Sequence, residues 1–402
     1  MGRVLQVCVV VFVSVFFIHA CVAQEKTAAK PRARDLGVPF DGTPGPLNAI
    51  TDVAGVTVGH KTLISGEGKL VVGQGPVRTG VTAIFPRGKG AQNGNVFAGW
   101  WSLNGNGEMT GTTWVEESGI LSGPVMITNT HSVGVVRDAV IQWTVARRNL
   151  GPDDDWWSLP VVAETWDGWL NDINGFHVKP EHVFQAIEST HGGPVEEGSV
   201  GGGTGMICNG FKGGIGTSSR RLGAADGGYT VGVLVQCNYG YRKYLRVTGI
   251  PVGREISGAD PSASMPGILL ERGSIIVVVA TDAPLLPHQL KRLARRVSLG
   301  LGRDGSISGN SSGDIFIAFS TANIDAAAPD HIVDVKMYPN DKLNPIFAAT
   351  VEATEEAVVN AMVAATSMTG IENHFVPGLP HDQLRAILRK YNRLNPQEDA
   401  TR

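Results

Sequence analysis

The stretch Glu271–Gln289, ERGSIIVVVATDAPLLPHQ, places a serine directly before an unbroken apolar run. The run begins at Ser274 and is apolar on both of its faces, which is typical of a strand buried on both sides of a sheet. A helical period follows from Pro287 to Leu301. The stretch therefore predicts a buried strand that leads into a helix, with Ser274 at the mouth of the strand.

The same two periodicities recur along the rest of the chain. Further strands are predicted at 56–60, 80–86, 229–237 and 314–321, and further helices at 133–148, 347–365 and 381–394. No Pro-rich or Ser-rich linker, charge block or internal repeat divides the sequence. We expect one layered domain of the α/β or α+β class with a largely buried sheet.

The charge balance and the motifs exclude several classes of protein. The chain has 34 Lys and Arg against 37 Asp and Glu and no basic runs, so nothing indicates a nucleic-acid or membrane-surface partner. The histidines lack H-E-x-x-H and the cysteines lack C-x-x-C. The glycine-rich segment Gly198–Gly216 is not followed by Lys-Ser/Thr and lacks the dinucleotide spacing. We expect neither a metal nor a cofactor.

The first residues have the pattern of an export signal. Arg3 precedes an apolar stretch at 9–17, and Cys21-Val22-Ala23 supplies small residues for cleavage, so Met1–Ala23 is predicted to be a signal peptide of an exported, periplasmic or secreted protein. An alternative reading of the same segment is a lipoprotein signal that ends at Cys21. The apolar stretch is short for a membrane span, and no later segment supplies ~18 uninterrupted apolar residues.

Removal of this signal would take away Cys8 and Cys21 and leave Cys208 and Cys237. An oxidising compartment would permit one disulfide between them. Both cysteines lie in apolar surroundings, where free cysteine usually behaves as a small buried hydrophobe. The sequence leaves the pairing open and favours two unpaired thiols.

A conventional serine nucleophile is a second candidate. Gly309–Gly313 matches G-x-S-x-G with Ser311 as its serine, a pattern that needs a strand before it and a helix after it. Here a polar loop precedes the match and a predicted strand follows, so the order is reversed. A serine esterase using Ser311, and a non-catalytic exported binding protein using the glycine-rich loops, remain as alternatives.

The position of Ser274 has both a structural and a chemical explanation. A hydroxyl at the start of a buried strand often only bonds a neighbouring backbone group. However, Gly273 permits an unusual backbone geometry and leaves the preceding carbonyl accessible. If the Gly273–Ser274 bond were cut, Ser274 would carry a free α-amine with a reference pKa of ~7.7–8, which is a general base on the nucleophile's own residue.

Long motifs on both sides of Ser274 resemble one family. The segments GSIIVVVATDAPLLPHQLKRLARR, GGGTGMICNGFKGGIGTSSR, VGVLVQCNYG and SSGDIFIAFST are similar to the DmpA/BapA family of self-processing serine aminopeptidases. The resemblance covers nearly the whole chain after Arg34. It implies a four-layer αββα sandwich similar to N-terminal nucleophile hydrolases but differently connected. It also implies an α polypeptide of residues 24–273, a β polypeptide of residues 274–402 and a tetramer of αβ units.

The resemblance also implies roles for individual residues. Ser274 matches the nucleophile, and self-cleavage is expected between Gly273 and Ser274. Ser312 and Asp314 match a serine and an acidic residue that lie beside the nucleophile, where they can orient the amine base. Asn238 matches an oxyanion-hole side chain, and an amide N–H in that role is worth ~3–4 kcal/mol.

Two more residues concern the substrate, which is expected to be a short peptide, amide or ester with a free amino group. Glu164 matches a carboxylate that holds the substrate's amine. Some family members have a tyrosine two residues later that assists the oxyanion hole, and this chain has Trp166 instead, which we expect to form a pocket wall. The segment Asn104–Gly111, NGNGEMTG, is expected to line the site with no assigned role.

Overall fold

The structure is a computed structural model that describes residue 2 and residues 30–91, 94–148, 151, 155–258, 260–261, 273–325 and 331–395. The chain divides into the units Met1–Lys30 and Pro31–Arg402, and the described helices and strands belong to the second unit. Apart from Gly2, the predicted signal Met1–Ala23 lies outside the described residues. In the described part of the chain, no helix combines the length and the apolar character needed to cross a membrane.

Two β-sheets form the interior of the second unit. The smaller sheet has the order β1-β2-β5-β6, and the larger has the order β4-β3-β12-β11-β10-β9. The smaller sheet consists of β1 (Thr57–Ser65), β2 (Val77–Phe85), β5 (Val125–Asn129) and β6 (Val161–Thr165). The larger consists of β3 (Val96–Ser102), β4 (Ile120–Leu121), β9 (Gly214–Arg221), β10 (Thr230–Asn238), β11 (Ser274–Thr281) and β12 (Ile315–Ser320). The pairs β5–β6 and β11–β12 are parallel, and the other neighbouring strands are antiparallel.

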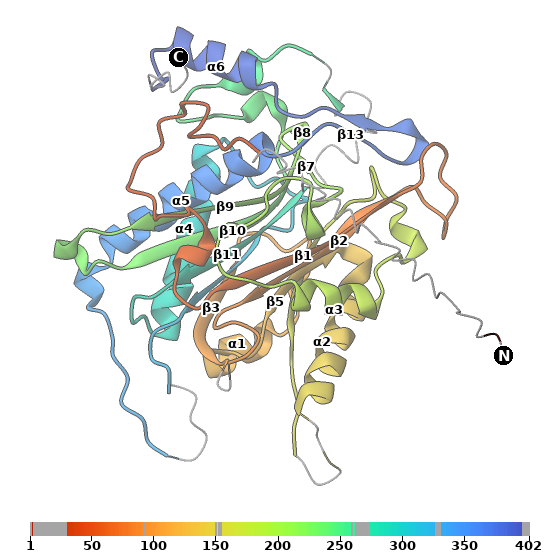
Figure 1. Ribbon diagram of the computed structural model, residues 1–402. Helices are drawn as coiled ribbons and strands as arrows, with labels where there is room; N and C mark the ends of the chain where they lie inside the picture. Colours follow the sequence, from red (N-terminus) through yellow and green to blue (C-terminus); the bar gives the residue numbers. More distant parts are fainter. Residues whose placement is uncertain are drawn as a thin grey trace. The chain divides into compact units, whose positions relative to one another are not determined.

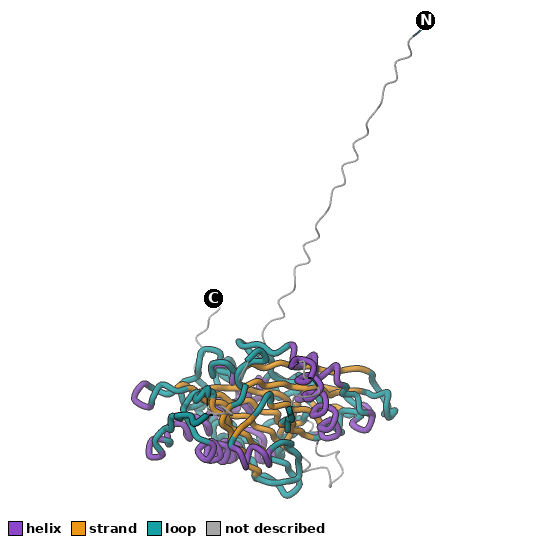
Figure 2. Tube along the Cα trace, turned by 90° about the horizontal axis from the view of Figure 1, so that it is seen from below, coloured by secondary structure: helices purple, strands orange, loops and turns teal. Residues whose placement is uncertain are grey.

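Helices cover the outer faces of both sheets, as Figures 1 and 2 show. The helices α2 (Val133–Arg148) and α3 (Pro180–Glu188) pack on the smaller sheet, and α4 (Pro287–Arg303) and α5 (Asn344–Val363) pack on the larger one. The order of layers is helix, sheet, sheet, helix, which confirms the predicted αββα sandwich. The shorter elements are α1 (Thr112–Ser118), α6 (His381–Lys390), β7 (Ile207–Cys208), β8 (Phe211–Lys212), β13 (Met368–Thr369) and β14 (Phe375–Val376).

The strand β11 explains why its sequence is apolar on both faces. Ile276, Val278 and Ala280 belong to the core between the two sheets. The alternate residues Ile275, Val277 and Val279 belong to the core under α4 and α5. Because successive side chains of a strand point to opposite faces, one central strand supplies two cores. Ser274 begins this strand, as predicted.

The two remaining cysteines form a disulfide, so the expectation of unpaired thiols was wrong. Cys208 in β7 bonds to Cys237 near the end of β10, with the two Cα atoms 5.6 Å apart. Both residues are fully buried in the core beneath α5. The apolar surroundings are therefore real, but sequence neighbours could not show that the β7–β8 hairpin folds back against β10.

Candidate active site

Ser274 and Asn238 meet at the end of the larger sheet. In the antiparallel pairing of β10 with β11, Asn238 is the register partner of Ser274. Both residues are 5% exposed. The sheet register therefore brings the predicted nucleophile and the predicted oxyanion residue to the same place, although 36 positions separate them in the numbering of the chain.

A single backbone N–H lies against both groups that self-cleavage would involve. The N–H of Gly313 donates to the Ser274 Oγ at 3.2 Å and to the Gly273 carbonyl at 3.4 Å. Gly313 lies in the turn just before β12, the parallel neighbour of β11. This N–H is placed to stabilise negative charge on the Gly273 carbonyl oxygen.

Ser312 and Asp314 flank that N–H in the same turn. The Ser312 hydroxyl donates to the Asp314 Oδ1 at 2.6 Å, and both residues are buried. Burial raises the pKa of Asp314, while the hydrogen bond from Ser312 opposes that rise. A hydroxyl that is hydrogen-bonded to a carboxylate can accept a proton and pass it on, and this pair lies beside Ser274.

Asn104 fixes the turn from the other side. Its side-chain amide donates to the carbonyls of Ser308 and Gly309 at 3.2 and 3.0 Å, and its Oδ1 accepts from the Asp314 N–H at 2.8 Å. One side chain therefore satisfies three backbone groups of the turn that carries Ser312 and Asp314. The sequence pattern had indicated only that this segment lines the site.

The Asn238 side chain is held at both ends of its amide. The Oδ1 accepts from the Ile207 N–H at 2.8 Å, and the Nδ2 donates to the Trp166 carbonyl at 2.9 Å. These two bonds fix which end of the amide is the nitrogen. The Nδ2 group carries a second N–H, so the residue keeps a donor for a developing oxyanion.

Glu164 lies in a separate acidic hollow. The carboxylate comes from β6, is 3% exposed, and accepts hydrogen bonds from the Glu108 N–H at 3.0 Å and from the Thr130 hydroxyl. Burial raises its pKa, and the hydrogen bond from Thr130 opposes this. The hollow is lined by Gly105, Asn106, Gly107, Glu108, Thr130, Glu164 and Trp166. A buried carboxylate here is suited to an ammonium group.

Trp166 stands between the acidic hollow and a second, aromatic pocket. This pocket of about 800 Å³, counted with the space open to solvent, is also lined by Asn238, Gly273 and Ser312. Its wall includes the aromatic side chains Trp166, Trp169, Tyr239, Tyr241 and Tyr244. Trp166 therefore lines both hollows.

The alternative nucleophile Ser311 has the wrong local geometry for a nucleophile elbow. It lies in the turn before β12, so a strand follows it and none precedes it directly. Its carbonyl accepts from the Asn106 side chain at 2.6 Å. Among the described residues, no group of three or more His, Cys, Asp and Glu side chains could hold a metal ion.

Comparison with known proteins assigns the chain to a family. The model of peptidase family S58 matches residues 48–376, most of the chain. The chain belongs to peptidase family S58. A beta-peptidyl aminopeptidase of Sphingosinicella microcystinivorans is 57% identical over 383 residues, which cover 93% of this S58 peptidase and 96% of that protein. The αββα layers and the peptidase class predicted from the sequence agree with this assignment.

Two solved structures show the same fold. The L-aminopeptidase D-Ala-esterase/amidase of Ochrobactrum anthropi, described as a new variant of the Ntn hydrolase fold, has a TM-score of 0.83 and 49% identity and covers 91% of this S58 peptidase and 100% of that chain. A Burkholderia sp. beta-aminopeptidase has a TM-score of 0.80 and 49% identity and covers 90% and 99%. The fold class is therefore that of the Ntn hydrolases.

Sequence reasoning missed the roles of Asn104 and Gly313 in this S58 peptidase. The sequence presents Gly313 only within the motif SSGD and Asn104 only within an expected lining loop. A backbone N–H leaves no mark in a sequence, so only the strand pairing of β11 with β12 reveals the contact of Gly313 with Ser274. The amide of Asn104 could have been suspected, since Asn commonly bonds the backbone of turns.

Proposed function

We propose that this chain is a self-processing serine aminopeptidase whose nucleophile is Ser274. The observation that carries the proposal is the shared N–H of Gly313, which lies against both the Ser274 Oγ and the Gly273 carbonyl. A nucleophile, the carbonyl before it and an oxyanion donor are thus present in one uncut chain. The membership of family S58 supports the same reaction class.

The first reaction is proposed to occur within the folded precursor. The Ser274 Oγ attacks the Gly273 carbonyl carbon, the Gly273–Ser274 C–N bond breaks, and an ester to Oγ replaces it. The nitrogen takes up the proton that Oγ loses, which yields the free α-amine. Water then hydrolyses the ester, leaving a Gly273 carboxylate on residues 24–273 and a serine amino terminus on residues 274–402.

The second reaction repeats this chemistry on a substrate. The α-amine of Ser274 removes the proton from Oγ, which attacks the carbonyl of the substrate's first residue. The leaving amine is protonated and departs, and water hydrolyses the acyl-enzyme. Ser312 and Asp314 orient the base and share its proton. Asn238, together with a backbone N–H, receives the negative charge on the substrate's carbonyl oxygen.

Substrate recognition is proposed to depend on the acidic hollow. An aminopeptidase must bind a free ammonium group, and the buried Glu164 carboxylate provides a charged partner for it. Trp166 forms the wall between this hollow and the aromatic pocket, which receives the part of the substrate beyond the scissile bond. Because relatives at 57% and 50% identity are both named beta-peptidyl aminopeptidases, we propose peptides with an N-terminal β-amino residue as the preferred class.

Export and assembly are part of the proposal. The disulfide between Cys208 and Cys237 supports an oxidising compartment, in line with a signal at Met1–Ala23 and with either cleavage after Ala23 or lipidation of Cys21. Amino-terminal sequencing of the mature protein distinguishes the two. An assembly of four αβ units rests on the family resemblance, and light scattering of the purified enzyme tests it.

The decisive experiment is intact mass spectrometry of the wild type beside Ser274→Ala. The expected wild type consists of two chains, of which the smaller begins at Ser274, and the expected variant is a single inactive chain. Ser311→Ala is the matched control, because Ser311 belongs to the same region but is not the proposed nucleophile. It should be cut and remain active.

Two outcomes would overturn the proposal. A wild type that stays whole and hydrolyses no amino-terminal amide would leave Ser274 as an ordinary strand residue. Activity that is lost in Ser311→Ala and retained in Ser274→Ala would instead support the conventional esterase. The substrate class is tested by comparing kcat/KM for p-nitroanilides of β-homoalanine and L-alanine.

A further inference from the structure

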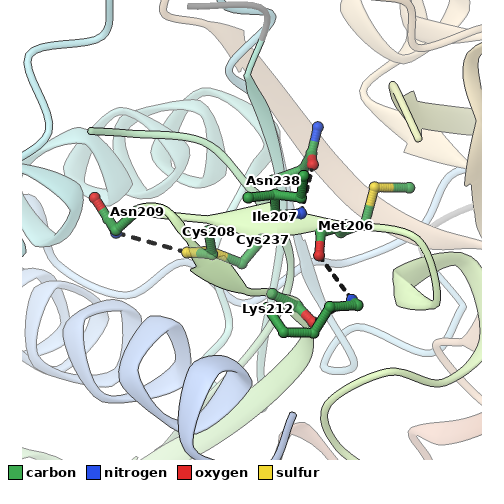
Figure 3. Close-up of a disulfide and its surroundings, with 8 residues drawn as sticks. Met206, Ile207, Cys208, Asn209, Lys212, Cys237 and Asn238 are labelled. Atoms are coloured by element: carbon green, nitrogen blue, oxygen red, sulfur yellow. Dashed lines mark hydrogen bonds between the residues drawn. A yellow bond between two sulfur atoms is a disulfide. The ribbon is translucent and has the colours of Figure 1, made fainter. Parts of the chain in front are cut away.

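The disulfide lies one residue away from the proposed oxyanion side chain. Cys237 directly precedes Asn238 at the end of β10, and Cys208 directly follows Ile207 in β7. The two cysteines are fully buried, with a sequence separation of 29. Figure 3 shows the disulfide with Asn238 and Ile207 beside it.

Two hydrogen bonds flank the disulfide on its two sides. On one side the Ile207 N–H donates to the Asn238 Oδ1 at 2.8 Å. On the other the Asn209 N–H donates to the Tyr239 carbonyl at 2.7 Å. Cys208 therefore lies between Ile207 and Asn209 in the chain. In the described structure, these two neighbours are the residues of the β7–β8 turn whose N–H groups bond to Asn238 and Tyr239.

Other hydrogen bonds hold the hairpin to itself and to the residue after β14, where the Pro377 carbonyl accepts from the Lys212 N–H at 2.7 Å. The buried Lys212 ammonium donates to the carbonyls of Met206 and Gly213 at 2.7 and 3.0 Å, and the Gly213 N–H donates to the Met206 carbonyl at 2.9 Å. These bonds keep the hairpin closed but do not reach Asn238. The Ile207 N–H is thus held near the end of β10 by the disulfide and its two flanking bonds, in addition to the β9–β10 ladder, in which Gly214 is the register partner of Cys237.

We infer that the Cys208–Cys237 disulfide is a positioning element of the oxyanion hole, so that turnover requires the oxidised pair. This inference rests on the proposed role of Asn238. The Ile207 N–H fixes the oxygen end of the Asn238 amide and thereby the direction of its nitrogen. If the side-chain amide were flipped, so that its oxygen and nitrogen exchanged places, the oxygen would face the developing oxyanion and repel it. In forming the S–S bond, the two thiols give two electrons and two protons to the disulfide of a thiol oxidase.

The test combines removal of the disulfide with removal of the amide. The double variant Cys208→Ala/Cys237→Ala should retain the two-chain mass pattern, while its kcat falls about 10-fold to 100-fold, as expected for a misplacement near 1 Å. Its KM should change less than about threefold, because Glu164 still binds the substrate amine. In the Asn238→Ala background the same cysteine changes should alter kcat by less than about twofold, since no amide remains to be positioned.

The cycle separates positioning from general stabilisation. If the disulfide only stabilised the fold, its loss would lower kcat equally in the presence and absence of the Asn238 amide, and that result would overturn the inference. Unchanged kcat in the double variant would do the same. Neither result bears on the proposed function, which is tested separately by the mass and activity of the Ser274→Ala variant. If even the wild type stays uncut and inactive, it is the proposed function that fails.

Chemical reduction provides an independent measurement if the double variant does not fold. Wild-type enzyme is treated with a phosphine in urea below its unfolding transition, and intact mass verifies the gain of two hydrogens. The kcat should fall on reduction and recover on reoxidation, whereas KM should stay nearly constant. A reduced enzyme with full kcat overturns the inference. Where the double variant does fold, it serves as the control that the phosphine leaves unaffected.

Discussion

At position 273 the backbone leaves no space for a side chain. A Cβ placed there would lie 2.7 Å from the Tyr239 Cα and 2.8 Å from the Asn238 carbonyl oxygen. Both neighbours are backbone atoms of the strand end that carries the proposed oxyanion residue, so they cannot yield without moving the site. The glycine before the nucleophile thus allows close approach of two backbones.

We expect Gly273→Ala to slow self-cleavage by at least about tenfold, because the added methyl group displaces the carbonyl from the Gly313 N–H. Intact mass measured over time after synthesis gives the rate. Gly302→Ala is the matched control, since a Cβ at Gly302 would meet nothing within 4 Å. Equal rates of cutting in the two variants would contradict the close-approach argument.

Asn104 provides a second prediction at this scale. Asn104→Asp removes the donor to Ser308 and Gly309 and places a charge beside Asp314, so kcat should fall about 10-fold to 100-fold in correctly cut enzyme. Asn323→Asp is the matched control, because the Asn323 side chain also bonds a backbone, donating to the Lys336 carbonyl at 3.0 Å and accepting from the Lys336 N–H at 2.8 Å, but lies outside the candidate site. Steady-state kinetics of both variants should show a loss in the first and near-wild-type kcat in the second.

Asp167 gives a prediction about pH. Burial raises the pKa of Asp167 to about 7, against hydrogen bonds from Thr79, Asn171 and Asn129. A carboxyl whose pKa is raised in the folded state contributes stability that is present below its unfolded pKa. That contribution is lost as the pH rises through the folded pKa. The free energy of unfolding should therefore decrease from about pH 4 to pH 7.

Asp167→Asn should remove this pH dependence. Between pH 4 and pH 8 the difference in unfolding free energy between the two proteins should change by roughly 4 kcal/mol in favour of the variant, at about 1.36 kcal/mol per pKa unit. Urea unfolding of both proteins in the uncut Ser274→Ala background, repeated at each pH, measures this difference in unfolding free energy. Parallel curves for the two proteins would show that Asp167 does not titrate in this range.

At the scale of elements, α5 binds the segment that precedes β1. Glu356 of α5 is fully buried and pairs with Arg34 and with Arg220 of β9, each at 2.8 Å. The side chain of Asn48 also donates to Glu356 at 2.6 Å. This carboxylate therefore joins a helix, a strand and the N-terminal segment.

Glu356→Ala should destabilise the protein by about 3–5 kcal/mol, because it removes the carboxylate at 2.8 Å from the buried Arg220 and leaves the longer pair with Glu352 at 3.7 Å. The control is Glu255→Ala, which breaks the surface pair with Lys390 and should have a negligible effect. Unfolding of both variants in urea compares them. A similar loss in the two would show that burial of the ion pair does not matter.

Five strands were predictable, whereas the apolar strands β3, β5 and β6 and the polar buried strand β9 were not among those predicted. The five predicted strands and four predicted helices are present, because their periodicity reflects burial directly. In contrast β9, with Thr217, Ser218 and Arg220, is polar in sequence yet buried. The Thr217 and Ser218 hydroxyls donate to carbonyls of β10 and α5, so partners distant in sequence satisfy them.

The same distinction applies to the candidate site. The sequence motifs gave Ser274, Asn238, Glu164, Ser312 and Asp314, and the fold brings Ser274 opposite Asn238 and beside the Ser312–Asp314 turn. Glu164 lies in its own hollow on the other side of Trp166. The contacts made by backbone groups, such as the Gly313 N–H, come only from strand pairing. The disulfide was missed for the same reason.

At the scale of the whole molecule, the proposed cleavage divides the strands of the larger sheet between two polypeptides. The strands β11 and β12 of the proposed β polypeptide lie between β10 and β3, which belong to the proposed α polypeptide. Each inner strand therefore keeps hydrogen bonds to the other chain after cleavage. The two cores on either side of β11 also contain residues from both chains.

The cut enzyme should therefore remain one particle. Native mass spectrometry and gel filtration should show the two chains together, and only denaturant should separate them. Dilution to nanomolar concentration should release neither chain, because separation would expose two apolar cores. Detection of a free smaller chain under native conditions would contradict the interleaved arrangement.

The interleaved sheet also changes what happens after the enzyme is denatured. A precursor refolds as a single molecule, at a rate that does not depend on its concentration. The cut form must bring two strands of one polypeptide back between strands of another, so its refolding rate depends on the concentration of both chains. Until the chains meet, the unpaired strand edges are exposed and promote aggregation. The lifetime of the mature enzyme is then set by its rate of unfolding. Self-cleavage makes unfolding harder to reverse, so the cut enzyme depends on kinetic stability.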